Sequence, residues 1–179
     1  MTGKEENALI KRTFKGNREL LQLVQSAMLG LDLTAQERKI LRDNFAGTEI
    51  MKVVRKRFMP QITKDTPVGQ MQDPWGGVEE MIFGRDPQTI QQALLYKEGA
   101  IEWTAKALER LEDPEKDGVS IGYEPKLYPN DPLGINLLVR NQFIKHVQTT
   151  LSILWVLAEN NDEETPQQTA QRLQRDSMQ

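Results

Sequence analysis

Apolar residues in the first third of the chain recur in two matching halves. In each half a short apolar pair precedes a turn of the form Phe-x-Gly and a polar residue, and apolar positions at helical spacing follow. The equivalent turn residues are Phe14 and Phe45, Gly16 and Gly47, and the candidate N-caps Asn17 and Thr48. The pattern predicts two helical hairpins in tandem over residues 5–59, which form a degenerate internal repeat.

Two longer helices are predicted in the second half of the chain. Pro87 follows an aspartate, as at the first position of many helices, and the apolar stripe of residues 87–112 continues from there. A further apolar pattern extends over residues 134–159.

Capping chemistry also supports the second hairpin of residues 5–59, because Thr34 and Glu37 have the spacing of a capping box.

The helix predicted over residues 134–159 carries apolar residues seven apart, with further apolar residues between them. The stripe consists of Leu137, Ile144, Val147, Leu151 and Leu154. A repeat of this kind lines the seam between packed helices, and Arg140 is its one misfit. Because residues 151–158 are apolar on nearly every side, the stripe is either the core of the fold or a buried interface between subunits.

Proline and glycine recur in two segments, residues 60–86 and 113–134, which predicts long irregular loops there. The first segment also carries large apolar side chains, namely Trp75, Met81 and Phe83. A loop with such residues either folds back on the core or docks into a neighbouring protein. In the second segment, alternating apolar residues at positions 119–123 are compatible with a short strand or hairpin.

Together these elements predict a mainly α fold. We expect a helical bundle built from two tandem helical hairpins plus two long helices, with long irregular loops and a C-terminal arm. Residues 1–159 should form a single helical domain, in which residues 87–159 supply the long-helix pair. Residues 160–179 form a polar arm with a helix cap at Thr165-Pro166. By itself this arm buries little surface, so we expect it to be mobile or to lie on another subunit.

The net charge of −3 conceals an uneven distribution. Residues 1–64 carry 13 Lys and Arg against 7 Asp and Glu, whereas residues 65–179 carry 10 against 19. Such an imbalance indicates an electrostatic partner, or contact between the two parts or between neighbouring subunits. The candidate partner face is a basic cluster on one short helix, formed by Lys52, Arg55, Lys56 and Arg57. The matching part of the first hairpin carries Lys11, Arg12, Lys15 and Arg18.

The chain offers little chemistry for catalysis. It has no cysteine, which removes disulfides, thiolate metal sites and thiol nucleophiles. Its one histidine, His146, lies in an apolar stretch, and no nucleophile-elbow serine is present to pair with it. Glycine patterns that bind phosphates or dinucleotides are also missing from the sequence. We therefore expect a non-enzymatic protein without a cofactor.

One acidic segment matches part of a calcium-binding loop. Asp113, Glu115, Asp117, Gly118 and Glu124 fall at loop positions 1, 3, 5, 6 and 12. Proline at position 2, serine at position 8 and a proline directly after the last ligand depart from that motif. We interpret the segment as an acidic, solvated helix end and turn rather than as a metal site.

In style the chain resembles small helical virion proteins of tailed bacteriophages. The resemblance rests on short capped helices with Phe-x-Gly turns, on long loops rich in proline and glycine, and on the polar arm after Asn160. It implies an assembly role in a particle, as a head-to-tail connector or as a capsid-associated or tail subunit. No functional residue is carried over from such proteins.

The first functional hypothesis is therefore a structural subunit that contacts copies of itself and other structural proteins. The second is a nucleic-acid-binding accessory protein, such as a packaging or genome-associated factor, that uses the basic first third to follow phosphates. The longest apolar run, Leu151–Ala158, is far shorter than a membrane-spanning helix. We expect a location in the virion or the cytoplasm, without secretion or membrane insertion.

Overall fold

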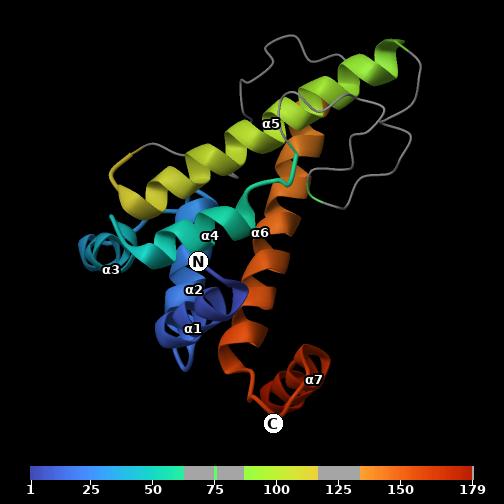
Figure 1. The fold of residues 1–179 in the computed structure, drawn as a ribbon. Helices are drawn as coiled ribbons and strands as arrows, with labels where there is room; N and C mark the ends of the chain where they lie inside the picture. The colour runs from blue at the N-terminus through green and yellow to red at the C-terminus, as the bar shows by residue number, and fades with distance from the viewer. Residues whose placement is uncertain (63–74, 76–86, 117–133, 179) are drawn as a thin grey trace.

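A computed structural model of the chain describes residues 1–62, 75, 87–116 and 134–178. This part of the chain is mainly helical and contains no β-strand, in agreement with the predicted fold class. Its helices are α1 (Gly3–Phe14), α2 (Arg18–Met28), α3 (Ala35–Phe45), α4 (Glu49–Phe58), α5 (Pro87–Glu112), α6 (Ile135–Glu159) and α7 (Pro166–Ser177). Figure 1 shows the short helices α1 to α4 clustered beside the two long helices, α5 and α6.

The two predicted hairpins are present, and their turns lie at the expected glycines. Gly16 between α1 and α2 and Gly47 between α3 and α4 have φ values of 71° and 67°. Only glycine enters this left-handed region at little cost. The next residue then caps the following helix: Asn17 Oδ1 accepts the N–H of Leu20 at 3.3 Å, and Thr48 caps α4 in the same way. The turn chemistry therefore explains where each helix ends and the next begins.

The two hairpins pack face to face rather than as stacked repeats. α1 packs against α4, and α2 packs against α3, so each helix meets the non-equivalent helix of the other hairpin. Two units related by an approximate twofold axis have this exchanged arrangement. At the centre, the buried rings of Phe14 and Phe45 lie with their centroids 6.4 Å apart.

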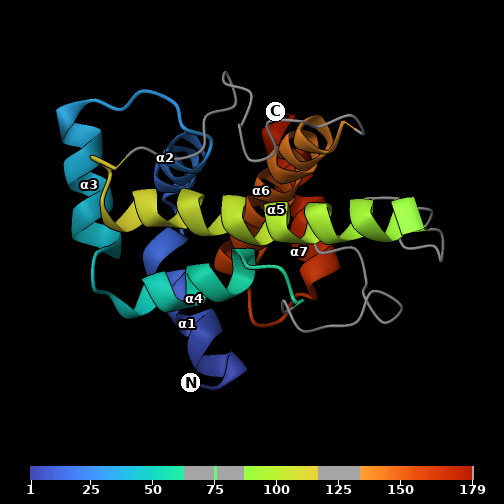
Figure 2. The same cartoon turned by 90° about the horizontal axis from the view of Figure 1, so that it is seen from above.

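α6 is the central helix of the molecule. It packs against α1, α2, α4, α5 and α7, and Figure 1 shows it extending past the hairpins from α5 to α7. Its buried residues recur every three or four positions, so one side of the helix faces the core. α5 packs across α2, α3 and α6, and Figure 2 shows it spanning the molecule from above. Trp103 of α5 and Phe143 of α6 meet edge to face with 5.6 Å between their centroids.

The predicted C-terminal arm contains a helix that packs against the end of α6. Thr165 and Gln168 form a reciprocal capping box at the start of α7. Thr169 is fully buried, and its hydroxyl accepts a hydrogen bond from Asn160 Nδ2 at 2.6 Å. Arg172 donates to the last carbonyl of α6 at 2.7 Å. The apolar pattern gave no sign of these contacts, because polar side chains make them.

Arginine side chains also satisfy carbonyls at the ends of helices distant in sequence. Arg110 of α5 donates to the carbonyl of Ala27 at 3.0 Å and to that of Leu31 at 3.1 Å, at the C-terminal end of α2. The last carbonyls of a helix have no partner within the helix, so such donors replace water there. Arg110 therefore joins α5 to the first hairpin through polar contacts as well as apolar packing.

Candidate interaction surface

The basic cluster predicted as a partner face lies on α4, and each of its four cations contacts a carboxylate of the same chain. Lys52 Nζ lies 3.0 Å from Glu49 Oε1, one turn earlier on α4. Arg55 reaches Glu112 at the end of α5, with 2.7 Å between its terminal nitrogen and Oε1. These pairs are exposed, so each adds little stability. They nevertheless neutralise the cations locally.

The other two cations of the cluster, Lys56 and Arg57, converge on Glu6 of α1. Their nitrogens lie 2.8 Å from Oε1 and 3.5 Å from Oε2 of that carboxylate. Glu6 is only 6% exposed, and the hydrogen bond from Lys56 holds the pKa of its carboxyl below the ordinary value. A buried carboxylate requires partners of this kind. The contact therefore joins α4 to α1, and with them the two hairpins.

The apolar stripe predicted on α6 is divided between core and surface. Val147, Leu151 and Leu154 are buried and Ile144 is half-buried, whereas Leu137 is 49% exposed. The buried positions near the start of α6 are Ile135, Val139 and Phe143 instead. A straight α-helix drifts away from a seven-residue repeat, so the stripe turns out of the core towards its N-terminal end.

Trp75 of the predicted docking loop lies against the core. Its ring packs edge to face on Tyr96 with 5.6 Å between the centroids, and it stacks on His146 at 6.0 Å. For this residue the structure agrees with packing on α5 and α6 rather than with docking into a neighbouring protein. The other two members of the loop, Met81 and Phe83, lie outside the described residues, as does the possible strand at positions 119–123.

His146 is half-buried on α6 and caps another helix. Its Nε2–H donates to the carbonyl oxygen of Phe58, the last residue of α4, at 2.6 Å. Burial lowers the pKa of His146 below the ordinary value, and the hydrogen bond to Phe58 opposes this shift only in part. The imidazole is therefore neutral at pH 7, and its surroundings are those of a helix cap.

The structure describes two of the residues that match a calcium loop, Asp113 and Glu115. Asp113 Oδ1 accepts the backbone N–H of Glu115 at 3.3 Å. The Glu115 carboxylate lies 2.7 Å from Arg38 and 3.4 Å from Arg42 of α3. The remaining three, Asp117, Gly118 and Glu124, lie outside the described residues. Within the described part of the chain, no three potential metal ligands gather at one place.

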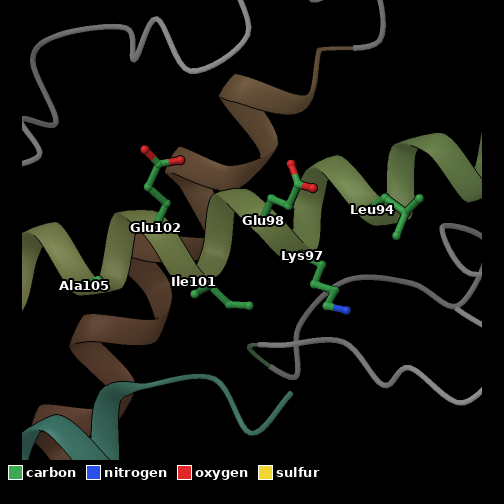
Figure 3. A pocket seen from close by; sticks show the side chains of 6 residues that line it. All are labelled: Leu94, Lys97, Glu98, Ile101, Glu102 and Ala105. Carbon is green, nitrogen blue, oxygen red and sulfur yellow. The ribbon is translucent and has the colours of Figure 1, made fainter. Parts of the chain in front are cut away.

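A hollow of about 390 Å³ lies along α5. The described residues that line it are Leu94, Lys97, Glu98, Ile101, Glu102 and Ala105. Figure 3 shows Glu98 and Glu102 on one side of the helix and Lys97 pointing to the other. Because the amine and the carboxylates point apart, they do not form an acid–base pair that could share a proton.

A second hollow, of about 360 Å³, forms a groove between α2, α6 and α7, which we name the α2–α6–α7 groove. Each helix contributes residues three or four positions apart, so three helix faces meet along it. Its apolar lining comes from Leu21, Leu151, Trp155, Val156, Ala170 and Leu173, and its polar lining from Arg18, Gln22, Gln25, Gln148 and Ser152. Sequence reasoning missed the groove, because it depends on how α7 lies against α6.

Three lysines of the first hairpin face the connection between α6 and α7. Lys4 and Lys11 are seven residues apart on one face of α1, and Lys15, four residues further on, is the C-cap residue of that helix; we name these three residues the lysine row. Lys11 Nζ lies 3.0 Å from Asp162 Oδ1. Lys11 most strongly, and Lys15 and Lys4 at longer range, hold the pKa of the Asp162 carboxyl below its ordinary value. The basic and acidic parts of the sequence therefore meet here within one molecule.

Comparison with known proteins identified no relative of the chain. No protein-family model matches it, and neither a curated protein nor a solved structure does so. None of the described helices is both long and apolar enough to cross a membrane. The functional proposal therefore rests on the surfaces of the molecule.

Proposed function

We propose that the protein is a non-enzymatic structural or assembly subunit that acts through protein–protein contacts. A phage particle is the setting that the sequence resemblance suggests, with the chain as a connector, a capsid-associated or a tail-associated component. The observation that carries the proposal is the α2–α6–α7 groove, whose lining suits a polypeptide partner.

The side chains of the groove match those by which proteins hold amphipathic helices. Trp155 is half-buried, so part of a large ring is open to a partner. The amides of Gln22 and Gln25 can donate to and accept from the polar groups of an incoming segment. Arg18 adds a cation at the start of α2. A partner helix with an apolar face and an acidic flank fits this lining.

The polar groups described above support a non-enzymatic role, because they hold the helices together. His146 caps α4, and Glu6 neutralises two cations between the hairpins. Glu115 pairs with two arginines of α3. Groups committed to such contacts are not free to exchange protons with a substrate.

Analytical ultracentrifugation of the purified full-length chain tests the proposal. We expect self-association that increases with protein concentration. Ser152→Arg should weaken it, because the long side chain would fill part of the groove and keep the apolar face of a partner out. Thr149→Arg adds the same side chain at an exposed position of α6 outside the groove, and it serves as the matched control. A protein that stays monomeric at every concentration, or that responds equally to both changes, would contradict the proposal.

A nucleic-acid-binding accessory role is the second candidate, and one observation favours it. Among the described residues, Arg12, Lys15 and Arg18 form no ion pair, whereas all four cations of the α4 cluster do. In this role, the affinity for duplex DNA would fall with salt by a log–log slope of about −0.9 per neutralised phosphate. Arg12→Gln would flatten the slope, and Lys52→Gln on α4 would not. The net charge of −3 opposes DNA binding and places this role second.

A further inference from the structure

We infer that the lysine row of α1 binds an acidic polypeptide segment of a partner protein, and that Asp162 occupies part of this surface in the isolated chain. The inference rests on the proposed role in protein–protein assembly and names the chemistry of the partner. A segment with several carboxylates would displace Asp162 and pair with all three lysines.

The lysine row carries more positive charge than the described structure neutralises. Lys11 has its ion pair with Asp162. Lys4 and Lys15 are exposed, and no described carboxylate lies within ion-pair distance of either one. Three lysines that act on a single carboxylate, only one of them in direct contact with it, favour the approach of further negative charge. Arg18, just beyond Lys15, lines the α2–α6–α7 groove, so an acidic amphipathic segment can reach both surfaces.

Asp162 is held only loosely at this surface. Its side chain is 96% exposed, and in the described structure its carboxylate accepts a single hydrogen bond, from Lys11 at 3.0 Å. Exposed ion pairs of this kind contribute little stability. A competing segment with more carboxylates can therefore replace Asp162 at small cost.

The fixed charges at this corner favour a short acidic peptide over a nucleic acid. Glu159 Oε1 accepts the backbone N–H of Gly16 at 2.7 Å, which keeps a carboxylate at the turn between α1 and α2. This charge remains in place when Asp162 leaves. Duplex DNA has one negative charge per about 1.7 Å of its axis, about twice the density of an extended acidic segment, so Glu159 and the net charge of the chain repel it more strongly.

Fluorescence anisotropy with a labelled hexaglutamate peptide tests the inference on the full-length protein at low ionic strength. Asp162→Asn should tighten binding about two- to fivefold, because it removes the internal competitor. Lys4→Gln and Lys15→Gln should each weaken binding by a similar factor, and added salt should abolish it. Lys52→Gln removes the same charge from α4 and should change nothing. Circular dichroism of each variant confirms that the helices are intact.

Three results would overturn the inference. The first is an absence of hexaglutamate binding at low ionic strength, and the second is an equal loss of binding in Lys15→Gln and Lys52→Gln. The third is duplex DNA that binds more tightly than the peptide through the same lysines, which would assign the surface to nucleic acid. If the protein self-associates in ultracentrifugation but does not bind the peptide, this inference is wrong and the proposed assembly role is unaffected.

Discussion

Phe14 and Phe45 occupy the same position in the two hairpins and contact each other, with their rings inclined by 31° and their centroids 6.4 Å apart. Contact between equivalent residues, together with the exchanged helix pairs, is the contact pattern of two units that pack through the same face. The repeat is therefore closed. Each hairpin buries a face of the other, so a third hairpin could not stack on the pair as in a solenoid.

The two phenylalanines should be energetically coupled. Phe14→Ala and Phe45→Ala should each lower the free energy of unfolding by about 3–5 kcal/mol, because both side chains are fully buried. The loss of unfolding free energy in the double variant should be about 0.5–3 kcal/mol smaller than the sum of the two single losses. The reason is that either single change already removes the contact between the two rings. Urea denaturation of the four proteins measures this difference. Strict additivity would contradict a direct contact between the rings.

Alanine at either turn glycine should destabilise the fold through the backbone alone. A Cβ at Gly16 or Gly47 would meet no other atom within 4 Å, but both residues have positive φ. The left-handed conformation costs an alanine about 1–2 kcal/mol. Thermal denaturation should show a similar loss for Gly16→Ala and Gly47→Ala. Gly3→Ala is the control, because Gly3 lies in equally open space but does not have a positive φ. This substitution should not lower the melting temperature.

Substitution by aspartate should have very different effects on stability at two leucines of the α6 stripe. Leu154→Asp puts a carboxylate into the core, where Leu154 is 1% exposed, and should prevent folding. Leu137→Asp should change the free energy of unfolding by less than about 0.5 kcal/mol, because Leu137 is half exposed. Far-ultraviolet circular dichroism distinguishes the two outcomes. Loss of helix in Leu137→Asp would mean that the start of α6 needs a partner.

His146 should make the fold less stable in mild acid. Its folded-state pKa lies below the ordinary value of 6.5, so the unfolded chain takes up a proton first as the pH falls. The free energy of unfolding should therefore decrease below about pH 6.5 and be unaffected by this group at higher pH. Urea midpoints at pH 7.5 and 5.5 test the sign. The decrease should be smaller in His146→Gln, and an unchanged decrease would assign it to other groups.

Glu6 should contribute stability that disappears at lower pH. Its folded-state pKa lies below the ordinary 4.5, so the contribution is complete above that value and is lost as the carboxylate takes up a proton. Glu6→Gln should lower the melting temperature at pH 7 and reduce the further decrease below pH 4.5. Glu5→Gln alters the exposed neighbour, which has no ion pair among the described residues. Equal behaviour of the two variants would contradict the role of Glu6 between the hairpins.

Features that depend on neighbouring residues could be predicted from the sequence. The caps at Asn17 and Thr48 and the turns at Gly16 and Gly47 follow from backbone chemistry within a few positions. The start of α5 at Pro87 follows in the same way. Such local signals fixed the limits of the helices and thereby the mainly α class.

Features that depend on distant residues could not be predicted in this way. The cations of α4 resemble a free partner face in the sequence, because Lys56 and Arg55 have their carboxylates 50 and 57 positions away, at Glu6 and Glu112. Only Lys52 has its carboxylate nearby, at Glu49. Many other carboxylates in the sequence were equally possible partners. The ion pair of the lysine row could not be predicted either, because Asp162 lies 151 residues beyond Lys11.

The contacts of Arg110 have a consequence for synthesis on the ribosome. The carbonyls of Ala27 and Leu31 receive this arginine only 83 and 79 residues after their own translation. Until then the end of α2 must remain hydrated, and α6, which later covers α1 and α2, has not yet been made. The nascent N-terminal half therefore emerges with an apolar face uncovered, and this face can be covered only after α6 has left the exit tunnel.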